Sequence, residues 1–172
     1  MFTLTAWLSN RIMLSIRIIC VGKLKERFYS DAVNEYAKRL AGFCKLEIVE
    51  IPENRLPAEP SDLQITNSLD KERSAIRASL PAGAFTVALC IEGQETDSHG
   101  LSALLSDCAG RGASRLCFII GGSYGLHTSL KTTADINLSL SKMTFPHNLA
   151  RIILLEQLYR AFMIIEGGKY HK

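Results

Sequence analysis

The sequence lacks the patterns that would indicate a disulfide framework, a bound metal or a membrane span. Its five cysteines are odd in number and contain no C-x-x-C pair, so neither disulfides nor a zinc site are predicted. No uninterrupted apolar segment approaches the length of a membrane span, and the opening MFTLTAWLSNRIM is too interrupted for a signal sequence. We therefore expect a cytoplasmic protein with no metal and no membrane association.

Strong charge excess and the common nucleotide-binding motifs are also absent. The glycine-rich segment 121–127, GGSYGLH, fits neither G-x-G-x-x-G nor G-x-x-x-x-G-K-[ST], which excludes Rossmann and P-loop sites there. A formal net charge of +3 on 172 residues permits an RNA partner without requiring one. No repeat or low-complexity segment interrupts the chain. We expect a single domain over residues 13–172, preceded by a disordered N-terminal extension over residues 1–12.

Strand-like and helix-like patterns alternate along the chain. Runs rich in β-branched and apolar residues predict strands, and apolar residues at helical spacing predict helices between them. The runs at 84–91 and 115–120 are almost wholly apolar, which is typical of parallel strands covered on both faces. These patterns predict an α/β fold, with ligands bound at the carboxyl ends of the strands. The expected strands are 15–21, 46–51, 84–91 and 115–120, and the clearest helices are 62–79, 98–112 and 147–166.

Two loops are candidates for binding chemistry. Gly121 and Gly122 follow a predicted strand, where they would allow positive φ and close approach of a ligand, or simply form a tight turn. The segment LSKMTF at 140–145 combines hydroxyls with apolar side chains, which suits an adenine ring, a ribose and an amino-acid tail. Its alternative is a buried loop that satisfies its own polar groups. Thr144 is positioned to cap the helix that follows.

The helix expected at 147–166 is apolar over much of its circumference. One core face needs fewer apolar residues, so a subunit interface is predicted on this helix. Glu156 and Arg160 stand four residues apart and are expected to form an ion pair along it.

Taken in order, several segments identify a family. VGKLKERF, IIGGSYGL, LSLSKMTFPH, R-x-x-L-x-EQ-x-YRA and the terminal YHK resemble the ribosomal RNA large subunit methyltransferase H family, within the SPOUT class. The resemblance implies a mostly parallel α/β sheet with helices on both faces and a C-terminal trefoil knot. It also implies a homodimer that uses S-adenosyl-L-methionine to methylate N3 of a pseudouridine in 23S ribosomal RNA, on assembled ribosomes.

The resemblance further implies site residues. Carried over position by position, the cofactor contacts fall on Leu89, Gly121 and the segment Leu140, Ser141, Lys142, Met143, Thr144 and Phe145. His171 is the candidate base or orienting group and Tyr170 would hold the nucleoside. Arg151 would contact a phosphate or the developing imide anion, or else form a structural salt bridge.

Two other functions stay open on the sequence. A SPOUT methyltransferase acting on another RNA, such as transfer RNA, would share the cofactor loop. A non-enzymatic ribosome-associated α/β module would share only the fold. A basic segment with Lys23, Lys25 and Arg27 would contact RNA backbone, or is an ordinary solvated helix start.

Overall fold

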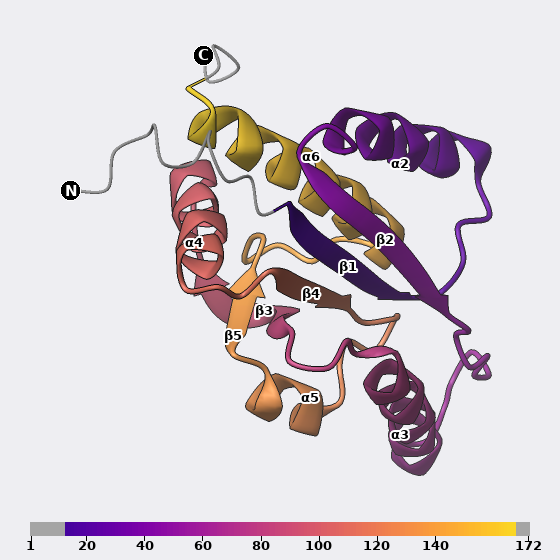
Figure 1. The fold of residues 1–172 in the computed structure, drawn as a ribbon. Helices are drawn as coiled ribbons and strands as arrows, with labels where there is room; N and C mark the ends of the chain where they lie inside the picture. Colours follow the sequence, from indigo (N-terminus) through magenta and orange to yellow (C-terminus); the bar gives the residue numbers. More distant parts are fainter. Residues whose placement is uncertain (1–12, 168–172) are drawn as a thin grey trace.

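The computed structural model describes residues 13–167, and its centre is a five-stranded parallel sheet (Figure 1). The strand order is β2-β1-β4-β3-β5, with every neighbouring pair parallel. The parallel sheet predicted from the apolar runs is therefore confirmed. The strands are β1 (Leu14–Val21), β2 (Cys44–Ile51), β3 (Phe85–Glu95), β4 (Arg115–Ile120) and β5 (Ile136–Ser139).

Helices cover both faces of the sheet, as the sequence predicts. On one face lie α2 (Arg27–Leu40), α4 (Ser98–Gly110) and α6 (His147–Ile165), and on the other lie α3 (Asp62–Ser79) and α5 (Thr128–Thr133) (Figure 1). Successive residues of a strand point to opposite faces. Ile18 of β1 and Phe118 of β4 accordingly pack in the core under α2, α4 and α6, whereas Ile19 and Ile119 pack under α3 and α5.

The N-terminal cap agrees with the sequence pattern at α3 and differs from the predicted cap at α6. Ser61 and Gln64 form a reciprocal capping box at the start of α3, which agrees with the predicted helix at 62–79. At α6 the predicted cap is wrong. Pro146 is the N-cap residue, which places Thr144 too far before the first turn to cap it, and no side chain within residues 13–167 caps this helix.

β3 departs from the predicted strand at its carboxyl end. Leu89 pairs with Leu138 of β5, and then Gln94 pairs with Leu138 again, so residues 90–93 bulge out of the ladder. At the end of the bulge, Gly93 packs directly against the β5 backbone. A side chain would not fit there, because a Cβ at Gly93 would lie 2.7 Å from the Leu138 carbonyl carbon. The expected strand at 84–91 thus continues as a bulge and a second short pairing.

α6 lies between α2 and α4 against the sheet. Its fully buried apolar residues Leu154, Leu155, Leu158, Ala161 and Phe162 all belong to the core on that face. Part of the apolar circumference that predicts a subunit interface is therefore used inside this chain. The remaining apolar residues of the helix, such as Leu149 and Ile153, are half-buried.

Candidate active site

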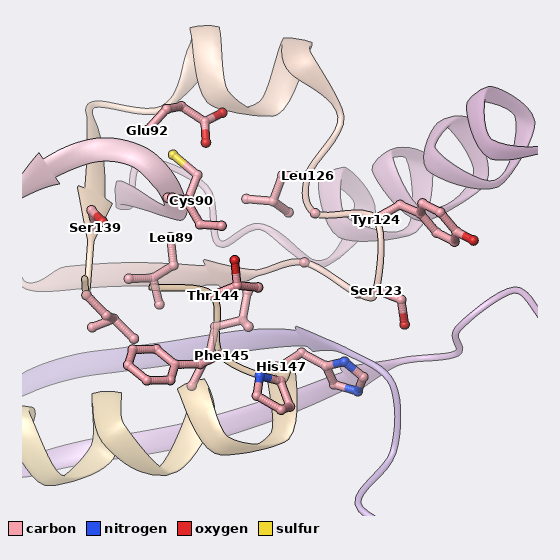
Figure 2. A pocket seen from close by; sticks show the side chains of 18 of the residues that line it. Leu89, Cys90, Glu92, Ser123, Tyr124, Leu126, Ser139, Thr144, Phe145 and His147 are labelled. Carbon is pink, nitrogen blue, oxygen red and sulfur yellow. The ribbon is translucent and has the colours of Figure 1, made fainter. Parts of the chain in front are cut away.

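A cavity of about 810 Å³ lies at the carboxyl ends of β3, β4 and β5 (Figure 2). This volume is within the range of small-molecule sites. Among the described residues, most of its lining comes from the carboxyl-terminal half of β3 with its bulge, the loop after β4, and the connection from β5 to α6; α5 and the start of α6 complete it. Both loops singled out from the sequence therefore meet at one place, at the sheet edge where ligands of α/β folds bind.

The predicted cofactor residues gather around this cavity with one exception. Lys142 is exposed and does not line it. Because the other residues come from separate parts of the chain, their convergence is a result of the fold. The lining includes Leu89, Gly121, Leu140, Ser141, Met143, Thr144 and Phe145.

The glycine loop after β4 forms the tight turn that the sequence left open as one alternative, and the positive φ expected at Gly121 and Gly122 is not found there. The positive φ of this loop lies at Gly125, at +76°, and not at Gly121 or Gly122. A Cβ on Gly121 would lie 2.3 Å from the carbonyl oxygen of Gly125, so the loop closes on its own backbone. The Gly125 amide donates to the Gly122 carbonyl at 3.0 Å. A tight turn that also borders the cavity is the result.

The connection from β5 to α6 is organised by its serines. Ser139 Oγ donates to the Ser141 carbonyl at 3.0 Å, and the Met143 amide donates to Ser141 Oγ at 3.0 Å. These bonds satisfy part of the loop internally, as the alternative interpretation of the sequence held. Thr144 stays exposed and Phe145 half-buried, and both border the cavity (Figure 2).

An ion pair that the sequence did not predict forms another part of the cavity wall. Lys131 of α5 donates its Nζ to a carboxylate oxygen of Glu92 in the β3 bulge. Both residues line the cavity. The hydrogen bond from Lys131 lowers the pKa of the Glu92 carboxyl below its usual range, and burial raises the pKa of the neighbouring Cys90 thiol.

His147, the first residue of α6, also lines the cavity, and its imidazole lies close to Gly22, the residue that follows β1. Gly22 has φ of +91°, and a Cβ there would lie 2.8 Å from His147 Nε2. A side chain at position 22 would therefore be strained and would push the imidazole away. Gly22, in the segment VGKLKERF, thus lies beside one lining residue of the candidate site.

Arg151 forms the structural salt bridge that the sequence left open as an alternative. Its side chain is only 1% exposed, and Nη1 donates to Glu50 Oε1 at 2.6 Å. Nη2 donates to the Gly22 carbonyl at 2.9 Å. Arg151 does not line the cavity; it fixes the ends of β1 and β2 to α6. The expected pair of Glu156 and Arg160 is confirmed, with Nη2 at 2.6 Å from Oε1.

Two further side chains at the site, Ser123 and Tyr124, were not predicted individually from the sequence. Ser123 Oγ donates to Glu53 Oε1 at 2.7 Å, which ties the glycine loop to the connection between β2 and α3. Tyr124 lines the cavity and is 46% exposed. The only sequence indication for Ser123 and Tyr124 was their position within the segment GGSYGLH.

Some predictions fall outside the described residues. Tyr170 and His171, as well as the extension over residues 1–12, lie there. Within 13–167, no three His, Cys, Asp or Glu side chains are grouped as metal ligands would be. In the same part of the chain no helix is both long and apolar enough to span a membrane.

The fold and cavity define an α/β domain with a cavity of small-ligand size at the carboxyl ends of parallel strands. The family model described as "Predicted SPOUT methyltransferase" matches residues 14–171. A relative from Methanococcus maripaludis, a putative ribosomal RNA large subunit methyltransferase H, is 46% identical over 92% of this chain and 100% of its own length. The Streptococcus sanguinis ribosomal RNA large subunit methyltransferase H is 43% identical over the same shares.

The chain therefore belongs to the ribosomal RNA large subunit methyltransferase H family of the SPOUT class, which confirms the resemblance seen in the sequence. A crystal structure of a probable methyltransferase from Bordetella pertussis Tohama I is similar in fold, with a TM-score of 0.56 at 16% identity. That match covers 88% of this chain and 98% of the other. Membership of the SPOUT class implies the trefoil knot predicted near the carboxyl end.

Proposed function

We propose that this protein methylates N3 of a pseudouridine in 23S ribosomal RNA on assembled ribosomes, with S-adenosyl-L-methionine as methyl donor. The observation that carries the proposal is the convergence of the predicted cofactor residues on one cavity in a member of this methyltransferase family. An enzyme on ribosomes would work in the cytoplasm.

The cavity fits the proposed cofactor by its chemistry. Leu89, Leu140 and Phe145 supply apolar walls for an adenine ring, while Ser141 and Thr144 supply hydroxyls that can hydrogen-bond a ribose. Glu92 and Lys131 add one charge of each sign. The cofactor, when bound, supplies a methyl group already activated on a sulfonium.

The protein would act mainly by alignment. Holding the pseudouridine ring nitrogen in line with the methyl carbon lowers the activation barrier by roughly several kcal/mol, as positioning does in intramolecular reactions. The new N–C bond forms as the S–C bond breaks, and the N3 proton must leave. His171 is proposed as the group that accepts this proton or orients the ring, and Tyr170 as the group that holds the nucleoside.

We assign Arg151 a positioning role in place of direct contact with RNA. Its guanidinium donates to the Gly22 carbonyl, and Gly22 leaves no room for a side chain beside His147 at the cavity. Lys23 and Lys25 follow Gly22 and are exposed beside this edge of the site, where they can meet RNA phosphates.

The active unit is proposed to be a homodimer built on α6. The half-buried residues Leu149, Ile152 and Ile153 provide apolar surface that the described part of this chain leaves partly open. Sedimentation at micromolar concentration should show two chains. A monomer with full activity would contradict this assembly.

Mass spectrometry of ribosomal RNA from cells lacking the gene tests the reaction. We expect loss of one methylated pseudouridine, and its return when the gene is restored. Unchanged ribosomal RNA together with loss of a methyl group from transfer RNA would move the substrate to transfer RNA. Isothermal titration with S-adenosyl-L-methionine separates both outcomes from a module that does not bind the cofactor.

A further inference from the structure

The pair formed by Glu92 and Lys131 is unusual among the residues around the cavity. Of the lining residues within 13–167, these two alone carry full charges, leaving aside the imidazole of His147. They come from different elements, the β3 bulge and α5, and their side chains meet at the cavity wall. The remaining lining is apolar or bears hydroxyls and backbone groups.

The charges lie apart from the apolar wall that suits an aromatic ring. In Figure 2, Glu92 lies on the α5 side of the pocket and Phe145 on the opposite side, with Leu89 between them. A ligand with a flat apolar end and a doubly charged end would match this arrangement. An apolar ligand would leave the charged pair without a function in binding.

We propose that Glu92 and Lys131 form the subsite for the amino-acid end of the methyl donor, with Lys131 taking the α-carboxylate and Glu92 the α-ammonium. The inference rests on the proposed use of S-adenosyl-L-methionine. Without ligand, each side chain neutralises the other. With ligand, each exchanges its partner for a group of the same sign, so no charge is left unpaired.

The exposure of the pair makes this exchange favourable. The side chains of Lys131 and Glu92 are 26% and 60% exposed, and ion pairs in contact with water contribute little stability. A ligand that fills the cavity excludes water from the same charges, which strengthens the new charge-assisted hydrogen bonds. Breaking the ion pair therefore costs less free energy than the new contacts with the ligand contribute.

A rival role is purely structural. The pair joins the β3 bulge to α5, so it could hold the cavity wall without touching the ligand. The two roles differ in one measurable respect. A structural support affects every ligand of the cavity alike, whereas a subsite affects only ligands that carry the amino-acid group.

Isothermal titration of the full-length protein with two probes separates these roles. S-adenosylhomocysteine carries the amino-acid end, while methylthioadenosine has the same adenine, ribose and thioether without it. Lys131→Met should weaken S-adenosylhomocysteine about tenfold, as expected for loss of one partly screened charge-assisted hydrogen bond. It should leave methylthioadenosine within about twofold, because the apolar and hydroxyl contacts persist.

Glu92→Gln provides an independent variant at a more exposed position. Its loss for S-adenosylhomocysteine should be smaller than tenfold, because this carboxylate is better solvated. Decarboxylated S-adenosylhomocysteine retains the ammonium alone. Its affinity should respond to Glu92→Gln and not to Lys131→Met.

Matched controls isolate the charge at the cavity. Lys131→Arg keeps the cation and should retain most of the affinity. Lys45→Met removes an exposed lysine charge near the start of β2, at the edge of the sheet opposite the cavity, and should leave both probes unaffected. Thermal melting of each variant near the wild-type temperature would show that the fold is intact.

Two results would overturn the subsite. One is an equal loss for both probes in Lys131→Met, which would make the pair a structural support. The other is undiminished S-adenosylhomocysteine affinity in both Lys131→Met and Glu92→Gln. A wild-type protein that binds neither probe would instead remove the proposed cofactor, and the subsite with it.

Discussion

Replacing Arg151 with methionine would test the assignment of this residue to structure. The guanidinium is 1% exposed and makes one bond to Glu50 Oε1 at 2.6 Å and one to the Gly22 carbonyl at 2.9 Å. Methionine occupies much of the same volume, so the substitution removes the two bonds without opening a large cavity.

The expected loss follows from the two partners left behind. The Gly22 carbonyl loses its buried donor, which costs about 1–3 kcal/mol. Glu50 has 32% of its side chain exposed and can regain water, so its share is smaller than for a fully buried partner. We expect a total of about 2–4 kcal/mol, or a melting temperature lower by roughly 5–15 °C for a domain of this size.

Thermal and urea unfolding monitored by circular dichroism would measure this loss. Arg27→Met is the matched control, because Arg27 pairs with Asp31 at 3.5 Å with 93% of its side chain exposed. The control should change stability by less than about 0.5 kcal/mol. If Arg151→Met were as stable as Arg27→Met yet inactive on ribosomes, the guanidinium would act on RNA and the structural assignment would be refuted.

Three further predictions concern the loop, the tail and the thiols. Gly121→Val should abolish S-adenosyl-L-methionine binding, measured by isothermal titration, because the valine side chain would displace the Gly125 carbonyl at the cavity. Deleting residues 170–172 should leave cofactor binding near normal and severely depress ribosome methylation. If the imidazole of His171 is the base, the pH profile of the methylation rate should show a titration near neutral pH that the His171→Ala variant lacks. Unfolding stability should fall as pH rises from about 9 towards 12, because burial raises the thiol pKa to about 12 at three sites, Cys20, Cys44 and Cys117, while the unfolded thiols ionise from their ordinary 9.0.

Each of these has a clear opposing result. Unchanged affinity in a folded Gly121→Val protein would remove that glycine from the site. A truncated protein that methylates ribosomes at the normal rate would withdraw the roles given to Tyr170 and His171. Wild-type stability that is flat across the alkaline range, or that falls there just as steeply in the Cys20→Ser, Cys44→Ser and Cys117→Ser variants, would show that burial of these thiols does not couple to folding.

Local pattern was sufficient for most of the architecture. The continuous apolar run at 115–120 predicted β4 with its observed ends, because a central parallel strand is buried on both faces. The helix predicted at 62–79 coincides with α3, whose capping box is encoded within four residues. The family motifs also located the cavity, since the glycine loop and segment 140–145 each follow a strand.

Tertiary structure decided how the site is held together. Arg151 and Glu50 are 101 residues apart, and nothing local distinguishes a buried salt bridge from an RNA contact. The pair of Glu92 and Lys131 depends on a bulge that forms because β3 meets β5 in two registers. Both arrangements arise from packing between segments distant in sequence, and a one-dimensional pattern of apolar and polar residues does not record which distant partners meet.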